Sequence, residues 1–153
     1  MTTSADPVAL VVVDTNVLLA ATDRSRTAHE MATRFLNEDV RRLALTPQIV
    51  REYLAVATRP VEVNGFGLPG DDAVANVEQF LDDMDLLPED VSTTRRLMEL
   101  IAGRSAAGKQ AHDANVVAVA LANQASVIVS DNTRHFAQFA DLIGIERLGA
   151  ASA

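Results

Sequence analysis

The sequence predicts an α/β protein, a three-layer α/β/α sandwich with a mostly parallel central sheet. Short apolar, β-branched runs alternate with segments of helical periodicity, as in βαβ units. The two strongest runs, residues 8–13 and 126–129, are largely apolar without alternation, which is typical of strands buried on both faces. The 153 residues show no repeat or linker, so we expect a single domain over residues 1–153.

The elements follow one another in a regular order. After the strand at 8–13, apolar residues recur at helical spacing over 27–38, and a short strand is expected at 43–46. Pro47 then opens a helix to residue 58, because proline is favoured in the first helical turn. The remaining segments are a loop at 59–70, helices at 71–83, 92–102 (with Ser92 as its cap), 112–124 and 133–140, strands at 84–87 and 126–129, and an apolar stretch at 143–145.

Composition narrows the class of protein. Hydrophobic residues make up 48% and charged residues 22%, as in ordinary globular domains. The absence of cysteine excludes disulfides, thiolate metal sites and thiol nucleophiles, and fits a reducing compartment. The first seven residues lack the pattern of a signal peptide, and no apolar run is long enough to span a bilayer. We therefore expect a cytoplasmic protein without a membrane segment.

The formal net charge of −8 is unusual for a protein that binds nucleic acid, because phosphates attract Lys and Arg. One interpretation is an acidic surface that keeps the protein in solution. The other is that some acids form a site whose charge bound cations reverse. Charge alone leaves both interpretations open.

Two acids follow the two strongest strands directly. Asp14 comes after 8–13 and Asp131 after 126–129, so parallel strands would bring both to the carboxyl edge of the sheet, where ligands bind in open α/β folds. Each also has a simpler explanation. Asp14 is a good helix cap, and a polar residue such as Asp131 is ordinary turn chemistry.

Two further acids lie on predicted helices. Glu52 is at the margin of the buried stripe of helix 47–58, where an acid also pairs with a base such as Arg51 or Arg59. Asp113 lies in the first turn of a very apolar helix, where the helix dipole stabilises it by roughly 0.3–1 kcal/mol. His112 beside it has no second histidine at metal spacing, so we expect a neighbour of the site or a packing residue.

Taken together, four such acids favour a metal site. Two carboxylates about 4 Å apart repel by roughly 4 kcal/mol at an effective dielectric near 20, and protons or cations relieve that repulsion. Oxygen ligands select Mg²⁺ or Mn²⁺, which lower the pKa of bound water and stabilise charge on a phosphate.

Four segments of the chain resemble, in order and over nearly its whole length, the motifs of PIN-domain ribonucleases of the VapC-toxin kind. They are VDTNVL (13–18), TPQIVREYL (46–54), HDAN (112–115) and IVSDNTRHF (128–136). The resemblance implies Mg²⁺- or Mn²⁺-dependent hydrolysis of RNA. It also implies a homodimer and a cognate antitoxin whose C-terminal segment lies along the active-site groove, lined by apolar residues of 61–68 unless that segment is a plain loop packed on the core.

The same resemblance implies site residues. Asp14 and Asp113 would bind the metal directly, Glu52 would hold the metal or its water, and Ser130 would lie beside them with Asn16 as a neighbour. The chain departs from the family at the fourth position. Many relatives have an acid or Asn two residues after the hydroxyl residue, which is Asn132 here, whereas Asp131 lies one step earlier. We expect Asp131 at this position, with Asn132 as the alternative.

Two other classes of function compete with a nuclease. An aspartate-based phosphatase would need an acid at Asn16, and a signalling receiver would need a Lys at a strand end, whereas the only Lys is Lys109 in a predicted loop. A non-catalytic binding module on a nuclease fold is the third class, and the four acids argue against it.

Overall fold

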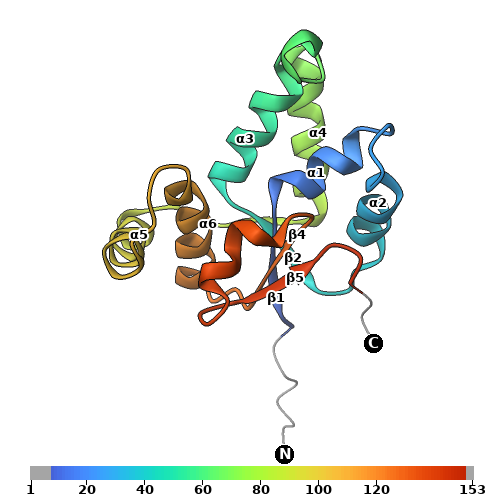
Figure 1. Cartoon of the computed structure of the whole chain (residues 1–153). Helices are drawn as coiled ribbons and strands as arrows, with labels where there is room; N and C mark the ends of the chain where they lie inside the picture. The colour runs from blue at the N-terminus through green and yellow to red at the C-terminus, as the bar shows by residue number, and fades with distance from the viewer. Residues whose placement is uncertain (1–7, 151–153) are drawn as a thin grey trace, which may run out of the picture.

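A parallel sheet of five strands forms the centre of the molecule (Figure 1). The computed structural model describes residues 8–150, so the N-terminal stretch without a signal-peptide pattern lies outside the described residues. The strands run in the order β3-β2-β1-β4-β5, and every neighbouring pair is parallel. Their bounds are β1 Leu10–Val13, β2 Arg42–Leu45, β3 Asp85–Leu86, β4 Val127–Ser130 and β5 Gly144–Arg147.

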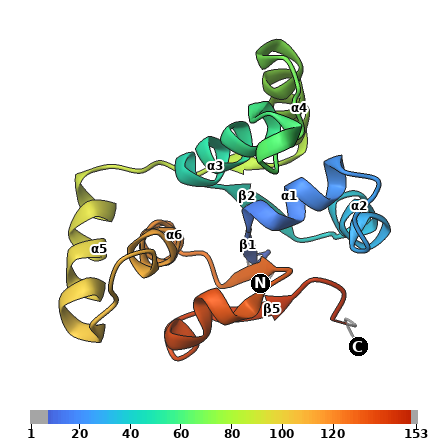
Figure 2. The same cartoon turned by 45° about the horizontal axis from the view of Figure 1, so that its top comes forward.

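Helices cover both faces of the sheet, which confirms the predicted three-layer sandwich (Figure 2). Helices α1 to α4, coloured blue to green, lie on one side, and α5, α6 and the 3₁₀ helix η2, coloured yellow to red, lie on the other. Their bounds are α1 Thr15–Thr22, α2 His29–Glu38, α3 Pro47–Thr58, η1 Val61–Val63, α4 Gly70–Asp83, α5 Val91–Arg104, α6 Gln110–Ala122 and η2 Thr133–Phe139.

The buried strands explain the apolar runs in the sequence. Strand β1 is the middle strand, and all four of its residues are buried between the two helical layers. Strand β4 pairs with it along Val11–Val13 and has three buried residues out of four. Since both faces of these strands are covered, a polar residue on either face would have lost its water, and the alternation seen in half-exposed strands is absent.

Helix α1 is the element that periodicity did not predict. Five of its eight residues are buried, and its apolar residues extend around most of the helix. A helix without a polar face has no amphipathic stripe to detect. Asp14 nevertheless marks its start, because the carboxylate accepts a hydrogen bond from the backbone N–H of Thr15 at 2.8 Å.

The beginning of α5 corrects the predicted cap at Ser92. Asp90 is the cap, and its carboxylate accepts from the backbone N–H of Thr93 at 3.1 Å. The hydroxyl of Thr93 accepts in return from the backbone N–H of Asp90 at 2.9 Å. This reciprocal capping box satisfies two backbone donors that a cap at Ser92 would have left free.

The segment between α3 and α4 folds back onto the core. Backbone N–H groups of Phe66 and Leu68 donate to the carbonyls of Val56 and Ala57 at 3.0 and 2.9 Å. The Phe66 and Leu68 side chains pack against the core, whereas Val61 and Val63 of η1 stay exposed. Most of this segment is therefore a packed loop, and its η1 turn presents apolar side chains to solvent.

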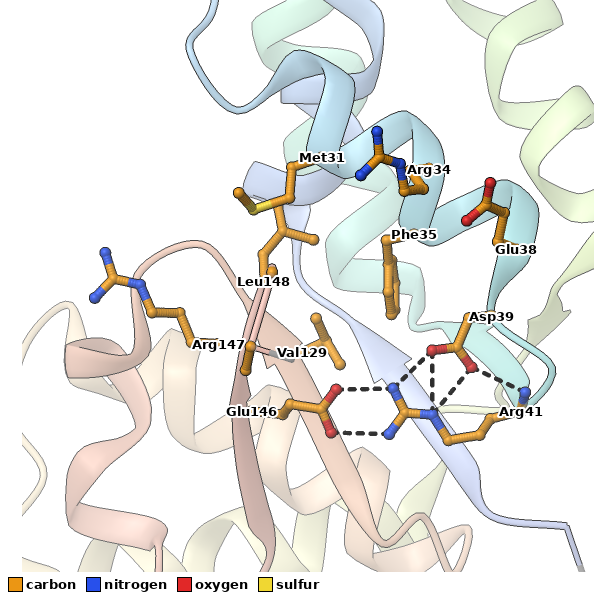
Figure 3. A pocket seen from close by; sticks show the side chains of 12 residues that line it. Met31, Arg34, Phe35, Glu38, Asp39, Arg41, Val129, Glu146, Arg147 and Leu148 are labelled. Atoms are coloured by element: carbon orange, nitrogen blue, oxygen red, sulfur yellow. Dashed lines mark hydrogen bonds and ion pairs between the residues drawn. The ribbon is translucent and has the colours of Figure 1, made fainter. Parts of the chain in front are cut away.

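A charged pocket lies between α2 and the edge strand β5, away from the acids that the sequence singled out (Figure 3). Arg41, just before β2, donates two hydrogen bonds of 2.8 Å to Glu146 of β5. It also donates to Asp39, at 2.8 Å through Nη2. One guanidinium thus holds two carboxylates and ties the edge strand to the other half of the sheet.

Candidate active site

Asp14 lies where the middle strand ends and α1 begins, at the carboxyl edge of the sheet. Its backbone N–H donates to the carbonyl of Val129 in β4 at 2.9 Å, which fixes the residue beside the end of that strand. One carboxylate oxygen caps α1, and the other accepts from the hydroxyl of Ser130 at 2.7 Å. Asp14 is only 8% exposed. The same side chain therefore caps α1 and binds the end of β4.

Burial governs the electrostatics of Asp14. Loss of water raises the pKa of its carboxyl, the hydrogen bonds from Ser130 and Thr15 oppose the rise, and the negative charge of Glu52 adds to it. An ionised Asp14 is consequently held at a cost in the folded protein. A cation at this position would remove that cost.

Glu52 projects from α3 toward the same edge. The Thr15 hydroxyl donates to its Oε2 at 2.8 Å, and the Gln48 amide donates to its Oε1 at 2.8 Å. In the described part of the chain, Glu52 forms no ion pair with Arg51 or Arg59, so the alternative of a surface pair is wrong. Both oxygens of Glu52 are oriented by neutral donors, which leaves its charge uncompensated.

Asp113 approaches from the opposite helical layer, in the first turn of α6. Burial raises the pKa of its half-buried carboxyl, His135 lowers it, and the charges of Asp14 and Glu52 raise it further. The negative charges of Asp14, at the end of β1, and of Glu52 on α3 therefore reach Asp113 on α6 across the carboxyl edge of the sheet.

The end of β4 completes the edge. Ser130, fully buried, donates to Asp14 and accepts from the side chain of Asn16 at 3.1 Å and from the backbone N–H of Asn132 at 3.0 Å. Asn16 in turn accepts from the backbone N–H of Asp131 at 3.0 Å. Ser130 and Asn16 are thus neighbours of Asp14, as expected.

The structure does not bring Asp131 into this group. Its side chain is exposed, and within residues 8–150 its carboxylate accepts no hydrogen bond and is not among the charges that shift Asp14 or Asp113. The Asn132 side chain caps η2 and has its Nδ2 3.2 Å from Nε2 of His135. The Asn132 side chain therefore lies against His135, whereas Asp131 contacts the predicted site only through its backbone N–H, which Asn16 accepts.

Sequence reasoning missed several polar residues around the acids. Thr15 and Gln48 hold Glu52, Asn115 holds Gln48, and His135 acts electrostatically on Asp14 and Asp113. A polar residue inside an apolar stripe was the available signal for Gln48 and Asn115. No such signal marked Thr15, which reads as part of a cap, or His135, which lies in an exposed turn.

The donor set fits a hard divalent cation. Its acids offer only oxygen, and the two whose pKa is raised gain from a nearby positive charge. As they stand, no three Asp, Glu or His side chains of residues 8–150 converge closely enough to hold an ion together. Mg²⁺ does not require three, because it is usually bound through one or two carboxylates and keeps several waters.

We predict that Asp14→Asn stabilises the protein at neutral pH in the presence of a chelator. The raised pKa means that folding favours the protonated carboxyl, so this contribution to stability is lost as pH rises through the folded-state pKa. Asn carries no charge to desolvate. The melting temperature of Asp14→Asn should therefore exceed that of the wild type at pH 7, and the difference should shrink as pH falls toward the ordinary range of an aspartate. A difference that does not change with pH would contradict this origin.

Comparison with known proteins assigns a family and a fold. The model of the PIN domain family matches residues 11–142. VapBC2 from Rickettsia felis, bound to a DNA fragment from its promoter, superposes with a TM-score of 0.66 at 15% identity, over 90% of this chain and 98% of that one. VapBC-1 from nontypeable Haemophilus influenzae gives 0.66 at 14%, over 91% and 98%. VapC20 from Mycobacterium tuberculosis, a sarcin-ricin loop cleaving toxin, gives 0.66 at 14%, over 83% and 93%.

No curated protein matches the sequence. Between residues 8 and 150, no helix has the length and apolar character needed to cross a membrane.

Proposed function

The chain belongs to the PIN-domain family, and on that premise we propose that it is a metal-dependent endoribonuclease, the toxin of a toxin–antitoxin pair. One observation carries the proposal. Asp14, Glu52 and Asp113 come from three separate elements and act electrostatically on one another at the carboxyl edge of the sheet. A fold gains no stability from such uncompensated acids, so a functional cation is the better explanation.

Asp14 and Asp113 would bind Mg²⁺ or Mn²⁺ directly, and Glu52 would bind the metal or orient a water on it. When bound, the metal lowers the pKa of a water and stabilises charge on the phosphate. The residues of the chain supply orientation. Ser130 holds one oxygen of Asp14, while Thr15 and Gln48 hold Glu52, so these two acids are fixed before the substrate arrives.

RNA is the proposed substrate, and an antitoxin protein is the proposed partner. The Mycobacterium structure is described as a toxin that cleaves the sarcin-ricin loop, and the Rickettsia and Haemophilus structures are VapBC proteins. We also propose a cytoplasmic homodimer in which residues 1–153 form one nuclease domain. The net charge of −8 supports binding of RNA through metal rather than through basic side chains.

The deciding experiment is a titration of Mg²⁺ or Mn²⁺ with single-stranded RNA, read both for cleavage and for binding. The proposal predicts cleavage only with metal, and RNA binding by the wild type, measured before cleavage, that weakens in chelator. Binding without cleavage at any metal concentration would favour a non-catalytic module. Cleavage that persists in chelator would contradict metal dependence.

The fourth position of the site is tested by a pair of variants. Asp131 was expected there, but its carboxylate accepts no hydrogen bond among residues 8–150. The Asn132 side chain instead lies 3.2 Å from His135, whose positive charge opposes the rise in the pKa of Asp14 and Asp113. We expect Asn132→Ala to require about 10–100-fold more metal for half-maximal cleavage, as for the loss of an outer-shell partner. Asp131→Asn should change this midpoint by less than about two-fold. The exposed Asp131 carboxylate orients no ligand, and the loss of an orienting partner typically costs about 10–100-fold.

The opposite result has an equally clear meaning. A shift in the metal midpoint of Asp131→Asn, with no shift in Asn132→Ala, would restore Asp131 as the acidic fourth residue. Both variants should be compared at equal folded fraction, because Asn132 also caps η2.

A further inference from the structure

Two buried side-chain amides lie between Glu52 and helix α6. Gln48 is one turn before Glu52 on α3, and Asn115 is on α6, two residues after Asp113. They are 6% and 8% exposed, which is uncommon for Gln and Asn. Burying such groups is unfavourable unless they are hydrogen-bonded, so the partners of each amide show what it holds in place.

Gln48 uses its whole amide. Its Nε2 donates to Oε1 of Glu52 at 2.8 Å and to the carbonyl of His112 at 2.9 Å, and its Oε1 accepts from Nδ2 of Asn115 at 2.8 Å. The reversed amide would turn its oxygen toward a carboxylate and a carbonyl, both of which only accept. The orientation of the Gln48 amide is therefore determined by its surroundings.

Asn115 fixes the other end of this chain of hydrogen bonds. Its Nδ2 donates to Gln48 and also to Oε1 of Glu89, at 3.0 Å, in the segment between β3 and α5. The second oxygen of Glu89 is buried without a hydrogen-bond partner among residues 8–150. Because Asn115 faces acceptors on both sides, its amide orientation is determined as well, and it presents a donor to Gln48.

We propose that Gln48 and Asn115 are positioning residues that set the Glu52 carboxylate relative to Asp113. Gln48 joins the Glu52 oxygen to the backbone carbonyl of His112, the residue immediately before Asp113. One amide thus links the Glu52 carboxylate to the backbone that carries Asp113, so that the two acids would bind a cation with little rearrangement. The inference rests on the proposed metal-dependent function. The simpler alternative is that the amides only stabilise the contact between α3 and α6.

The test measures Mn²⁺ binding directly, by the loss of the free-ion signal in electron paramagnetic resonance, together with thermal unfolding in chelator. Gln48→Met keeps a similar unbranched volume and removes both donors to Glu52 and His112. We expect its Kd for Mn²⁺ to rise about 10–100-fold, as when a partner that orients a ligand is lost. Asn115→Ala leaves Gln48 in place but frees its orientation, so a smaller rise in the same direction is expected.

Asn123→Ala is the matched control. Asn123 follows the last residue of α6 and also donates two hydrogen bonds from Nδ2, to the carbonyls of Pro88 and Val119. It should lower the melting temperature as Asn115→Ala does, while leaving the Kd for Mn²⁺ unchanged. If the hydrogen bonds of Gln48 and Asn115 were purely structural, Asn115→Ala and Asn123→Ala would be alike both in melting temperature and in Kd for Mn²⁺.

The outcomes separate the two proposals. Wild-type affinity for Mn²⁺ in both Gln48→Met and Asn115→Ala overturns the positioning role and leaves the proposed nuclease function standing. Absence of Mn²⁺ binding by the wild type overturns both. If Gln48→Met does not fold, the comparison of Asn115→Ala with Asn123→Ala decides the question. An unchanged Kd for Mn²⁺ in Asn115→Ala then overturns the positioning role.

Discussion

Asp113→Asn is expected to abolish RNA cleavage while the protein stays folded. The variant keeps the size of the side chain in the first turn of α6 but loses the charge that would hold the cation. A bound metal contributes several kcal/mol of charge stabilisation, and each 1.4 kcal/mol is a factor of ten in rate, so a loss of about a thousand-fold or more is expected. The measurement is the single-turnover cleavage rate at saturating Mg²⁺ or Mn²⁺.

Asp71→Asn provides a matched control for this loss. Asp71 is also an acid in the first turn of a helix, α4, and it is exposed. Its removal takes away the same charge and a similar interaction with a helix dipole, so any general effect of these changes would appear in both variants. Wild-type cleavage by Asp71→Asn is expected. Retained cleavage by Asp113→Asn would remove Asp113 from the mechanism.

Divalent metal is expected to stabilise the wild-type fold substantially and Asp14→Asn much less. A ligand that binds only the folded state adds RT ln(1 + [L]/Kd), which is about 2.7 kcal/mol at one hundred times Kd. For a domain of this size, that corresponds to a rise in melting temperature of roughly 5–10 °C. The cation would compensate the desolvated charge of the buried Asp14 carboxylate, which is the physical source of the gain, and relief of repulsion from Glu52 adds a smaller part.

The order of stability of the wild type and Asp14→Asn is expected to differ between chelator and metal. Asp14→Asn should be the more stable protein in chelator, because it lacks the desolvated charge, and should lose that advantage when Mg²⁺ stabilises the wild type. Asp71→Asn should respond to metal as the wild type does. An equal rise in melting temperature for the wild type and Asp14→Asn would show that the stabilising ion binds elsewhere.

The sequence predicted those elements whose burial produces a recognisable pattern of apolar residues. Strands β1 and β4 are covered on both faces, so their residues form apolar runs that are visible without a structure. Pro47 marks the start of α3, and the helix ends at Thr58 as predicted. The ends of parallel strands placed Asp14 and Asp131 at one edge, and the resemblance placed Ser130 beside Asp14. The Ser130 hydroxyl does lie 2.7 Å from Asp14, whereas the Asp131 side chain is exposed.

Other features were decided by packing. Helix α1 has no polar face, so no period distinguishes it from a buried strand. For α5, Ser92 was the predicted cap, and the reciprocal hydrogen bonds with Thr93 identify Asp90 instead. Glu52 was ambiguous for the same reason, because a helical wheel gives its angle on α3 but not the identity of what faces it.

By itself the sequence determined that Asp14 and Asp131 follow two buried strands and that Glu52 and Asp113 lie on helices, because apolar runs and helix period place a residue along and around its own element. Only the tertiary structure decided how those acids are held. Gln48 and Asn115 come from helices in different layers, and their hydrogen bond joins residues 67 positions apart. Whether Asp131 or Asn132 connects with Ser130 depends on the turn after β4, where the rotation of one residue changes the partner. Such contacts follow from the distances between elements, which no local pattern in the chain records.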